Sequence, residues 1–360
     1  MKFKGNPFFW GFAEQRSIET LAKRMKATYN TPREVKEQKD TLYNPFGQTF
    51  GHSPNPAFIT GATALDPLPY IVPFNTVVVD VTDFFATDTT NPNKSYTLVG
   101  SGETISMSQS KSFIGKSVKL ENVNLSSESS VKNTLNIVAN DSKLNDLTLS
   151  GSWSKDISGN TMITLNNTKN LEITNLEIDR TNGYNAVEIG LDGKGTVKNV
   201  VIDGLKINSS LSNNGINIFS FEDGANITIK NCHFKEVSNP IRISNMTYAK
   251  NVNITIKDCT FDKWESNTPA YAGLILLQDH TSTSTEEFNE KNPFATFNIT
   301  IDNVTGPYGK ITKGDTMENM CGSSSADKQL IYIYGDHCGE GNTASLIPYS
   351  KEVYPTVVLT

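Results

Sequence analysis

Residues 227–234 and 254–261 hold the stretch that decides the fold: Ile227-Thr-Ile229-Lys-Asn231-Cys232-His-Phe234, then Ile254-Thr-Ile256-Lys-Asp258-Cys259-Thr-Phe261. Each copy is a short strand with alternating apolar residues, one small or amide-bearing residue, and a second short strand. Related copies begin at Val118, Leu144, Leu171, Val200 and Ile299. The recurrence indicates one structural unit that is repeated along residues 117–304.

The residue between the two strands of each copy is the most regular feature of the repeat. It is a small or short polar residue, separated from the next by 24, 29, 29, 27, 27 and 45 residues: Asn122, Asp146, Asn175, Gly204, Asn231, Asp258 and Asn303. Gly, Asn and Asp enter the left-handed backbone region most readily. A strand-based period of this length predicts a β-solenoid whose corners form a column of these residues.

A further strand is expected in each coil, about half a period from a corner. The candidates are Leu135–Val138, Met162–Leu165, Ala186–Ile189, Gly215–Phe219, Ile241–Ile243 and Gly273–Leu277. Three short strands per coil with one-residue corners resemble the right-handed parallel β-helix of the pectate-lyase-like superfamily. The resemblance concerns architecture, because many activities and many inert fibres share this scaffold. We therefore expect an all-β chain with a parallel β-helix over residues 111–334.

The first 75 residues differ in composition from the repeats. Residues 1–43 predict a helical anchor with helices near 11–29 and 32–42, the second introduced by Thr31 and Pro32. Residues 44–75 carry a single formal charge, Asp66, among repeated Pro, Gly and Phe residues. This composition predicts an extended docking arm or, alternatively, a segment wrapped over its own β-helix. Residues 76–110 predict a β cap, and residues 335–360 a C-terminal strand and tail.

Charge and hydropathy exclude several classes of function. The net charge of −6 and the lack of a Lys/Arg stripe argue against a nucleic-acid surface. No apolar run approaches the roughly 18–20 residues that span a bilayer. The apolar residues after Met1 are interrupted by Asn6 and Pro7, unlike a signal peptide. The sequence has no phosphate loop, nucleophile elbow or zinc pattern, so we expect no cofactor, no bound metal and synthesis in a cytoplasm.

The four cysteines fall into two pairs. Cys232 and Cys259 occupy the same apolar position in successive copies, so we expect them to stack as free thiols in the core. Cys321 and Cys338 either bridge or remain free.

Catalytic candidates come from two patterns. β-Helix enzymes that cleave polysaccharides need two acids, often beside a basic residue, on one outward face. The expected outward row here contains Thr164, Glu188, Asn217 and Arg242. It holds one acid and one guanidinium about two coils apart, so a structural polar face is the alternative reading.

A repeated dipeptide supplies the second pattern. Asp279-His280 and Asp336-His337 each end an apolar strand, and stacking of the two strands would bring them into one Asp/His cluster. Both dipeptides also suit a strand-ending corner.

Aromatic residues between the strands are candidates for glycan binding. Trp153, Tyr184 and Trp264 (with Tyr248 and Tyr271) fall between strands, where aromatic rings stack on sugars or pack down over the coil.

A chain with an N-terminal anchor and a β-helix shaft resembles the virion appendages of tailed bacteriophages, namely head fibres and tail spikes. Its Asn-, Thr- and Lys-rich usage is similar to that of phages of gut Bacteroides-type hosts, including crAss-like phages. The resemblance implies a virion location after assembly in the host cytoplasm, and docking to capsid, portal or tail proteins through residues 1–75. It also implies a homo-oligomer, with a trimer favoured, and adhesion to host surface polysaccharide. The alternative is a polysaccharide lyase or hydrolase that uses the acids named above.

Overall fold

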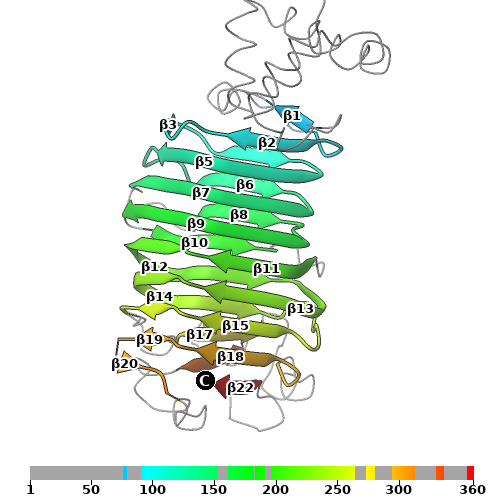
Figure 1. Cartoon of the computed structure of the whole chain (residues 1–360), viewed down its shortest axis with the longest axis vertical. Helices are drawn as coiled ribbons and strands as arrows, with labels where there is room; N and C mark the ends of the chain where they lie inside the picture. Colours follow the sequence, from blue (N-terminus) through cyan, green and yellow to red (C-terminus); the bar gives the residue numbers. More distant parts are fainter. Residues whose placement is uncertain are drawn as a thin grey trace, which may run out of the picture.

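The computed structural model describes residues 76–78, 91–152, 161–181, 183–190, 196–263, 273–279, 294–307, 309–312, 330–335 and 355–360. These residues form strands and connecting turns, without a helix, stacked into a tall parallel β-solenoid (Figure 1). The expected all-β parallel β-helix is confirmed. The expected helices before residue 44, the arm over 44–75, and both Cys321 and Cys338 lie outside the described residues.

Three ladders of strands make up the solenoid, and β5, β7, β9, β12 and β14 each bend from one ladder into the next. The first sheet contains β1 (Thr76–Val78), β2 (Ser95–Val99), the first halves of β5 (Ser117–Ser127), β7 (Asp141–Ser152) and β9 (Asn170–Thr181), then β11 (Val197–Asp203), β13 (Phe221–Lys230), β15 (Asn253–Lys257), β18 (Asn298–Asp302) and β22 (Thr356–Leu359). The second sheet contains β3 (Thr104–Met107), the second halves of β5, β7 and β9, the first residues of β12 (Lys206–Phe219) and β14 (His233–Ser244), β16 (Thr260–Phe261) and β19 (Thr305–Gly306).

The third sheet completes each coil. It contains β4 (Lys111–Ile114), β6 (Asn133–Val138), β8 (Thr161–Asn166), β10 (Gly183–Ile189), the later residues of β12 and β14, β17 (Ile275–Asp279) and β21 (Ile331–Gly335). Among the described strands, the pairing of β19 with β20 (Gly309–Lys310) is antiparallel, and the pairings within the three ladders are parallel.

The repeated small and amide-bearing residues lie at the corner between the first and second sheets. All the corner residues have a positive φ, from 48° at Asn303 to 76° at Gly204. Their side chains also bond along the stack, since Asn175 Nδ2 donates to Asp146 Oδ1 at 2.9 Å and Asn303 Nδ2 donates to Asp258 Oδ1 at 2.7 Å. The corner residues therefore supply both a permitted left-handed backbone and hydrogen bonds between coils.

A second column of amides precedes the strands of the first sheet. Asn199 Nδ2 donates to Asn170 Oδ1 at 2.8 Å, and Asn298 Nδ2 donates to Asn253 Oδ1 at 3.0 Å. Asn253 Nδ2 in turn donates to Asn226 Oδ1 at 3.1 Å. These side chains are exposed, and the column accounts for the Asn that directly precedes the apolar strand in several copies.

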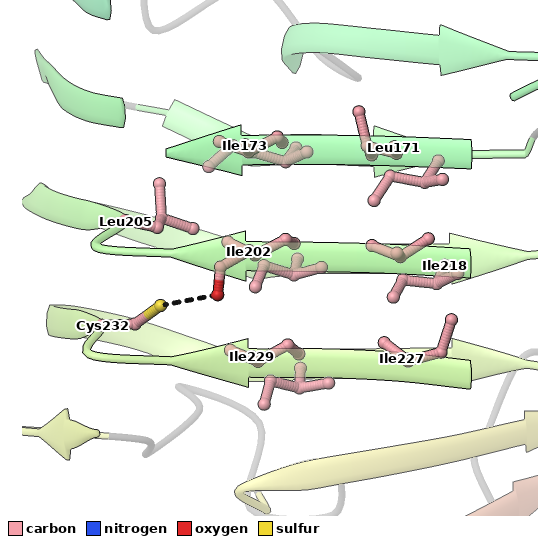
Figure 2. Close-up of a cluster of buried hydrophobic side chains, with 14 of the residues drawn as sticks. Leu171, Ile173, Ile202, Leu205, Ile218, Ile227, Ile229 and Cys232 are labelled. Carbon is pink, nitrogen blue, oxygen red and sulfur yellow. Dashed lines mark hydrogen bonds between the residues drawn. The ribbon is translucent and has the colours of Figure 1, made fainter. Parts of the chain in front are cut away.

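The inward side chains stack in columns that fill the solenoid. Ile173, Ile202 and Ile229 lie one above another on neighbouring coils of the first sheet, and Leu171 and Ile227 belong to the column beside them (Figure 2). Burying an aliphatic side chain of this size contributes about 1.5–3 kcal/mol, so successive coils stabilise one another. The rings of Phe234 and Phe261 are nearly parallel, with centroids 4.8 Å apart, which matches the spacing of neighbouring strands.

Cys232 and Cys259 lie in this interior as free, buried thiols, as expected. The Cys232 thiol lies 3.8 Å from the Ile202 carbonyl oxygen of the preceding coil (Figure 2). The interaction with the neighbouring Cys259 thiol, together with burial, raises the pKa of Cys232. Both cysteines therefore act as small buried residues of the core, each directly after a corner residue.

Strands β2 and β3, which the sequence analysis assigns to a cap, pair in parallel with β5. Tyr96 lies opposite Val118, and Ile105 lies opposite Leu125. They extend the same first and second ladders by a further coil, because Tyr96 and Leu98 supply the same inward apolar alternation as the later copies.

Candidate functional site

The outer face of the third sheet carries the row of side chains that contains the first set of catalytic candidates. Thr164 lies opposite Glu188, Glu188 opposite Asn217, and Asn217 opposite Arg242 on successive coils. Leu276 continues the row beyond Arg242. Glu188 and Arg242 are thus two coils apart, roughly 10 Å at the spacing of parallel strands.

A second polar row lies on the same strands, three residues earlier in each. Asn185, Asn214 and Asn239 are in register on β10, β12 and β14, beside Glu188, Asn217 and Arg242 respectively. Gly215 follows Asn214 because a Cβ there would meet the Pro240 carbonyl oxygen at 2.6 Å and the Phe234 ring at 2.9 Å. We call the two rows together, Asn185, Glu188, Asn214, Asn217, Asn239 and Arg242, the amide strip.

Glu188 is the acid at the end of the amide strip. Its carboxylate accepts hydrogen bonds from Asn185 Nδ2 at 2.8 Å and Thr161 Oγ1 at 3.0 Å, and a long one from Asn217 Nδ2 at 3.5 Å. Burial raises the pKa of Glu188, and these hydrogen bonds and the charge of Arg242 offset only part of that effect. A carboxyl group with a raised pKa, held beside amides and a guanidinium, is suited to hydrogen bonding or proton exchange with a ligand.

Arg242 forms the other end of the strip. Its guanidinium carbon lies 5.6 Å from the centre of the Phe219 ring, within cation–π distance. Phe219 lies opposite Ser244 in the neighbouring coil, next to the row of Arg242. The aromatic ring thus supports the guanidinium against the sheet and fixes its position.

The amides of the strip are shielded from solvent. Asn214 is 0% exposed, Asn217 1% and Asn239 4%, whereas Lys143 and Glu172 on the first sheet are exposed. The carbonyl oxygens Oδ1 of Asn214, Asn217 and Asn239 accept no hydrogen bond from the protein. The strip therefore combines burial with acceptor atoms that are left unused.

The second catalytic pattern is only partly described by the structure. Strands β17 and β21 do pair in parallel, and Asp279 lies opposite Gly335. His280, Asp336 and His337 lie outside the described residues, as do Trp153, Trp264 and Tyr271. Tyr184 belongs to β10 by its backbone, and Tyr248 lies half-buried in a turn with a φ of 53°.

The described residues hold no group of three or more His, Cys, Asp and Glu side chains arranged to bind a metal ion. They also contain no helix with the length and hydropathy needed to span a membrane. Among the residues that the structure describes, the amide strip combines a carboxyl group of raised pKa with unused buried acceptors.

Comparison with known proteins adds no assignment. No family model, curated protein or solved structure matches this chain.

The row of Asn185, Asn214 and Asn239 was missed as a site by reasoning from sequence. A signal was present, because an Asn precedes the third-sheet strand in three successive coils. Asn is also a common turn residue, so the repetition alone does not distinguish a binding row from a row of turns.

Proposed function

We propose that the chain is a structural appendage of a tailed-phage particle, a head fibre or tail-spike-like protein whose β-helix is a projecting shaft. The observation that carries the proposal is the continuous parallel pairing of the first sheet from β2 to β22, which builds an elongated rod (Figure 1). A rod made of repeated coils suits a spacer between a particle and a surface.

The outer faces of the first and second sheets are suited to a shaft surrounded by solvent. The outer face of the first sheet carries ion pairs between coils, such as Lys143 Nζ with Glu172 Oε2 at 2.8 Å and Lys257 Nζ with Asp302 Oδ2 at 3.2 Å. Among the described residues the large exposed apolar side chains are single and separated: Ile114, Val201 and Val358. Such faces are solvated, so docking to capsid, portal or tail proteins is assigned to residues 1–75.

The experiment compares the full chain with a chain that lacks residues 1–75, each produced during infection and each checked for β structure by circular dichroism. The proposal expects both to fold and only the full chain to purify with particles, where labelling places it at a projection. Incorporation of the shortened chain, or absence of the full chain from particles, contradicts the proposal. Mass measurement of the purified full chain tests the favoured trimer.

A polysaccharide lyase or hydrolase is the second candidate, and the raised pKa of Glu188 favours it. A glycoside hydrolase commonly needs a second carboxyl group across the scissile bond. Within the described rows of the amide strip the remaining members are amides and Arg242, so Glu188 would act with Arg242 and not with a second acid. Appearance of new reducing or unsaturated ends from host polysaccharide, lost in Glu188→Gln, would establish this candidate.

A further inference from the structure

We propose that Cys232 and Cys259 form a redox-responsive cross-link between two successive coils, present as two thiols under reducing conditions and as a disulfide after oxidation. The two residues directly follow the corner residues Asn231 and Asp258 and are 27 residues apart in the sequence. Both are free thiols in the structure. Their separation is set by the stacking of the coils and not by a loop.

Backbone hydrogen bonds hold the two cysteines against each other. The N–H of Asn231 donates to the Lys257 carbonyl oxygen at 3.1 Å. The N–H of Thr260 donates to the Cys232 carbonyl oxygen at 2.9 Å. Because these bonds lie on either side of the pair, the two Cα atoms have the separation of neighbouring strands, about 4.8 Å. Disulfides usually join Cα atoms that are about 4.4–6.8 Å apart, so the backbone is already placed for the bond.

The two thiols are also close to each other. The Cys232 Sγ lies 3.0 Å from the Lys230 carbonyl oxygen, and the Cys259 Sγ lies 3.1 Å from the equivalent oxygen of Lys257. The Cys259 Sγ is in addition 3.7 Å from the Ile229 carbonyl oxygen, in the coil that carries Cys232. A hydrogen bond between the two thiols raises the pKa of Cys232 and lowers the pKa of Cys259. A small movement of the side chains therefore brings the sulfur atoms to bonding distance.

Packing alone does not account for sulfur at both positions. The residue after the corner is aliphatic in the other coils: Val123, Leu147, Leu176, Leu205 and Val304. The two coils with cysteine carry the large Phe234 and Phe261 rings two residues later, which favours a small residue beside them. Alanine would meet that requirement equally well. Thiols in two adjacent coils add the capacity for a covalent bond between them.

The oxidation takes place in two steps with a two-electron oxidant, for which hydrogen peroxide is the simplest. The Cys259 thiolate attacks one peroxide oxygen, which forms a sulfenic acid and releases hydroxide. The Cys232 sulfur then attacks the sulfenic sulfur, the S–S bond forms, and the hydroxyl group leaves with the thiol proton as water. The exposed corner residues Asn231 and Asp258 are next to the thiols, so a local opening of the corner admits a molecule of the size of water. The reaction is slow because the fold must open first.

The timing of the cross-link rests on the proposed function, whereas its chemistry does not. Under the proposed function the chain is made in a reducing cytoplasm and acts outside the cell, where disulfides persist. The thiols would then remain free during assembly, and the disulfide would join the two coils after release. A purified chain that forms the disulfide without being found in particles refutes the appendage alone. A chain that enters particles but cannot form the disulfide refutes the cross-link alone.

The experiment uses the purified full chain, reduced with dithiothreitol and then treated in its native state with dilute hydrogen peroxide. After the peroxide is removed, free thiols are alkylated in urea and the peptides are analysed by mass spectrometry. We expect a disulfide-linked pair of peptides that contain Cys232 and Cys259, formed within one chain over hours and reversed by dithiothreitol in urea. The oxidised protein should melt roughly 5–10 °C above the reduced protein, because the bond constrains the unfolded chain.

Two variants are the controls. Cys232→Ser removes one thiol and should show neither the linked peptides nor the peroxide-dependent rise in melting temperature. Leu205→Cys with Cys232→Val keeps two cysteines in the same column but two coils apart, roughly 10 Å, and should not form the bond. Linkage only in urea, linkage only between chains, no linkage, or an oxidised protein that melts no higher than the reduced one would overturn the inference.

Discussion

Glu188 and Arg242 lie in one row on the outer face of the third sheet, two coils apart, with Asn217 between them. The two residues interact electrostatically. The charge of Arg242 lowers the pKa of Glu188, but burial raises this pKa more strongly. The same row is shielded from solvent at Asn217, in contrast to the charged outer face of the first sheet. The amide strip is therefore chemically distinct from the rest of the shaft.

The raised pKa of Glu188 predicts a specific pH dependence of stability. A group whose pKa is higher in the folded state stabilises the fold below its unfolded pKa, and this contribution is lost as pH rises through the folded pKa. Glu188→Gln removes the titration, so its melting temperature should fall less than that of the unmodified chain from about pH 4.5 upward. Thermal melts across this range are the measurement. Parallel pH profiles of the two proteins would show that the Glu188 pKa is not raised.

The corner column predicts a separation of backbone and side-chain effects at Asn175. Asn175→Gly keeps the positive φ and loses the hydrogen bond to Asp146, whereas Asn175→Ala loses the bond and strains the backbone as well. A left-handed non-Gly residue costs roughly 1–2 kcal/mol, so Ala should destabilise more than Gly despite its lower backbone entropy in the unfolded chain. Urea unfolding of both variants measures the difference. Equal or greater stability of the Ala variant would argue against the left-handed corner.

The stacked rings of Phe234 and Phe261 predict a large and coupled contribution to stability. Each ring is fully buried, so either Phe→Ala change should cost about 3–5 kcal/mol. The double variant should cost less than the sum by about 0.5–1.5 kcal/mol, because the first change already removes the ring–ring contact. A double-mutant cycle measured by urea unfolding checks this. Strict additivity would show that the rings do not stack.

The interior position of Cys232 and Cys259 predicts low reactivity. Both thiols are buried and therefore shielded from the reagent. The pKa of Cys232 is also raised, by the Cys259 thiol and by burial, whereas the hydrogen bond with Cys232 lowers the pKa of Cys259, so the low reactivity of Cys259 rests on its burial. Iodoacetamide should modify the two peptides in urea and leave them unmodified in the native protein, as read by mass spectrometry. Rapid native modification of either peptide would place its cysteine outside the core.

The shaft was predictable from the sequence because the residue types of its repeat have local conformational preferences. The corner residues require a left-handed backbone, and Ile227 and Ile229 alternate inward on a strand, so fold and corner positions follow from Asn231 and its equivalents. The outward row of Thr164, Glu188, Asn217 and Arg242 followed from the same alternation.

The site was less predictable because it depends on burial and on hydrogen bonds between coils. Asn170 and Asn214 are the same residue type in similar strand-preceding positions, yet the first is exposed and bonded while the second is buried with an unused carbonyl oxygen. No local pattern separates the two cases. The pairing of Asp279 with Gly335 is likewise a matter of register between two strands far apart in the sequence, which the dipeptide repeat does not encode.

The in-register stacking of parallel coils is tested most directly by a pair of engineered cysteines. Val201 and Thr228 are direct partners on the outer face of the first sheet, so Val201→Cys with Thr228→Cys places the two Cα atoms within disulfide distance. We predict that mild oxidation links these two peptides within one chain, as detected by mass spectrometry. Val201→Cys with Lys230→Cys is two residues out of register, beyond the roughly 7 Å that a disulfide bridges, and should stay reduced. Efficient linkage of the second pair, or none of the first, would contradict the β-helix and the account built on it.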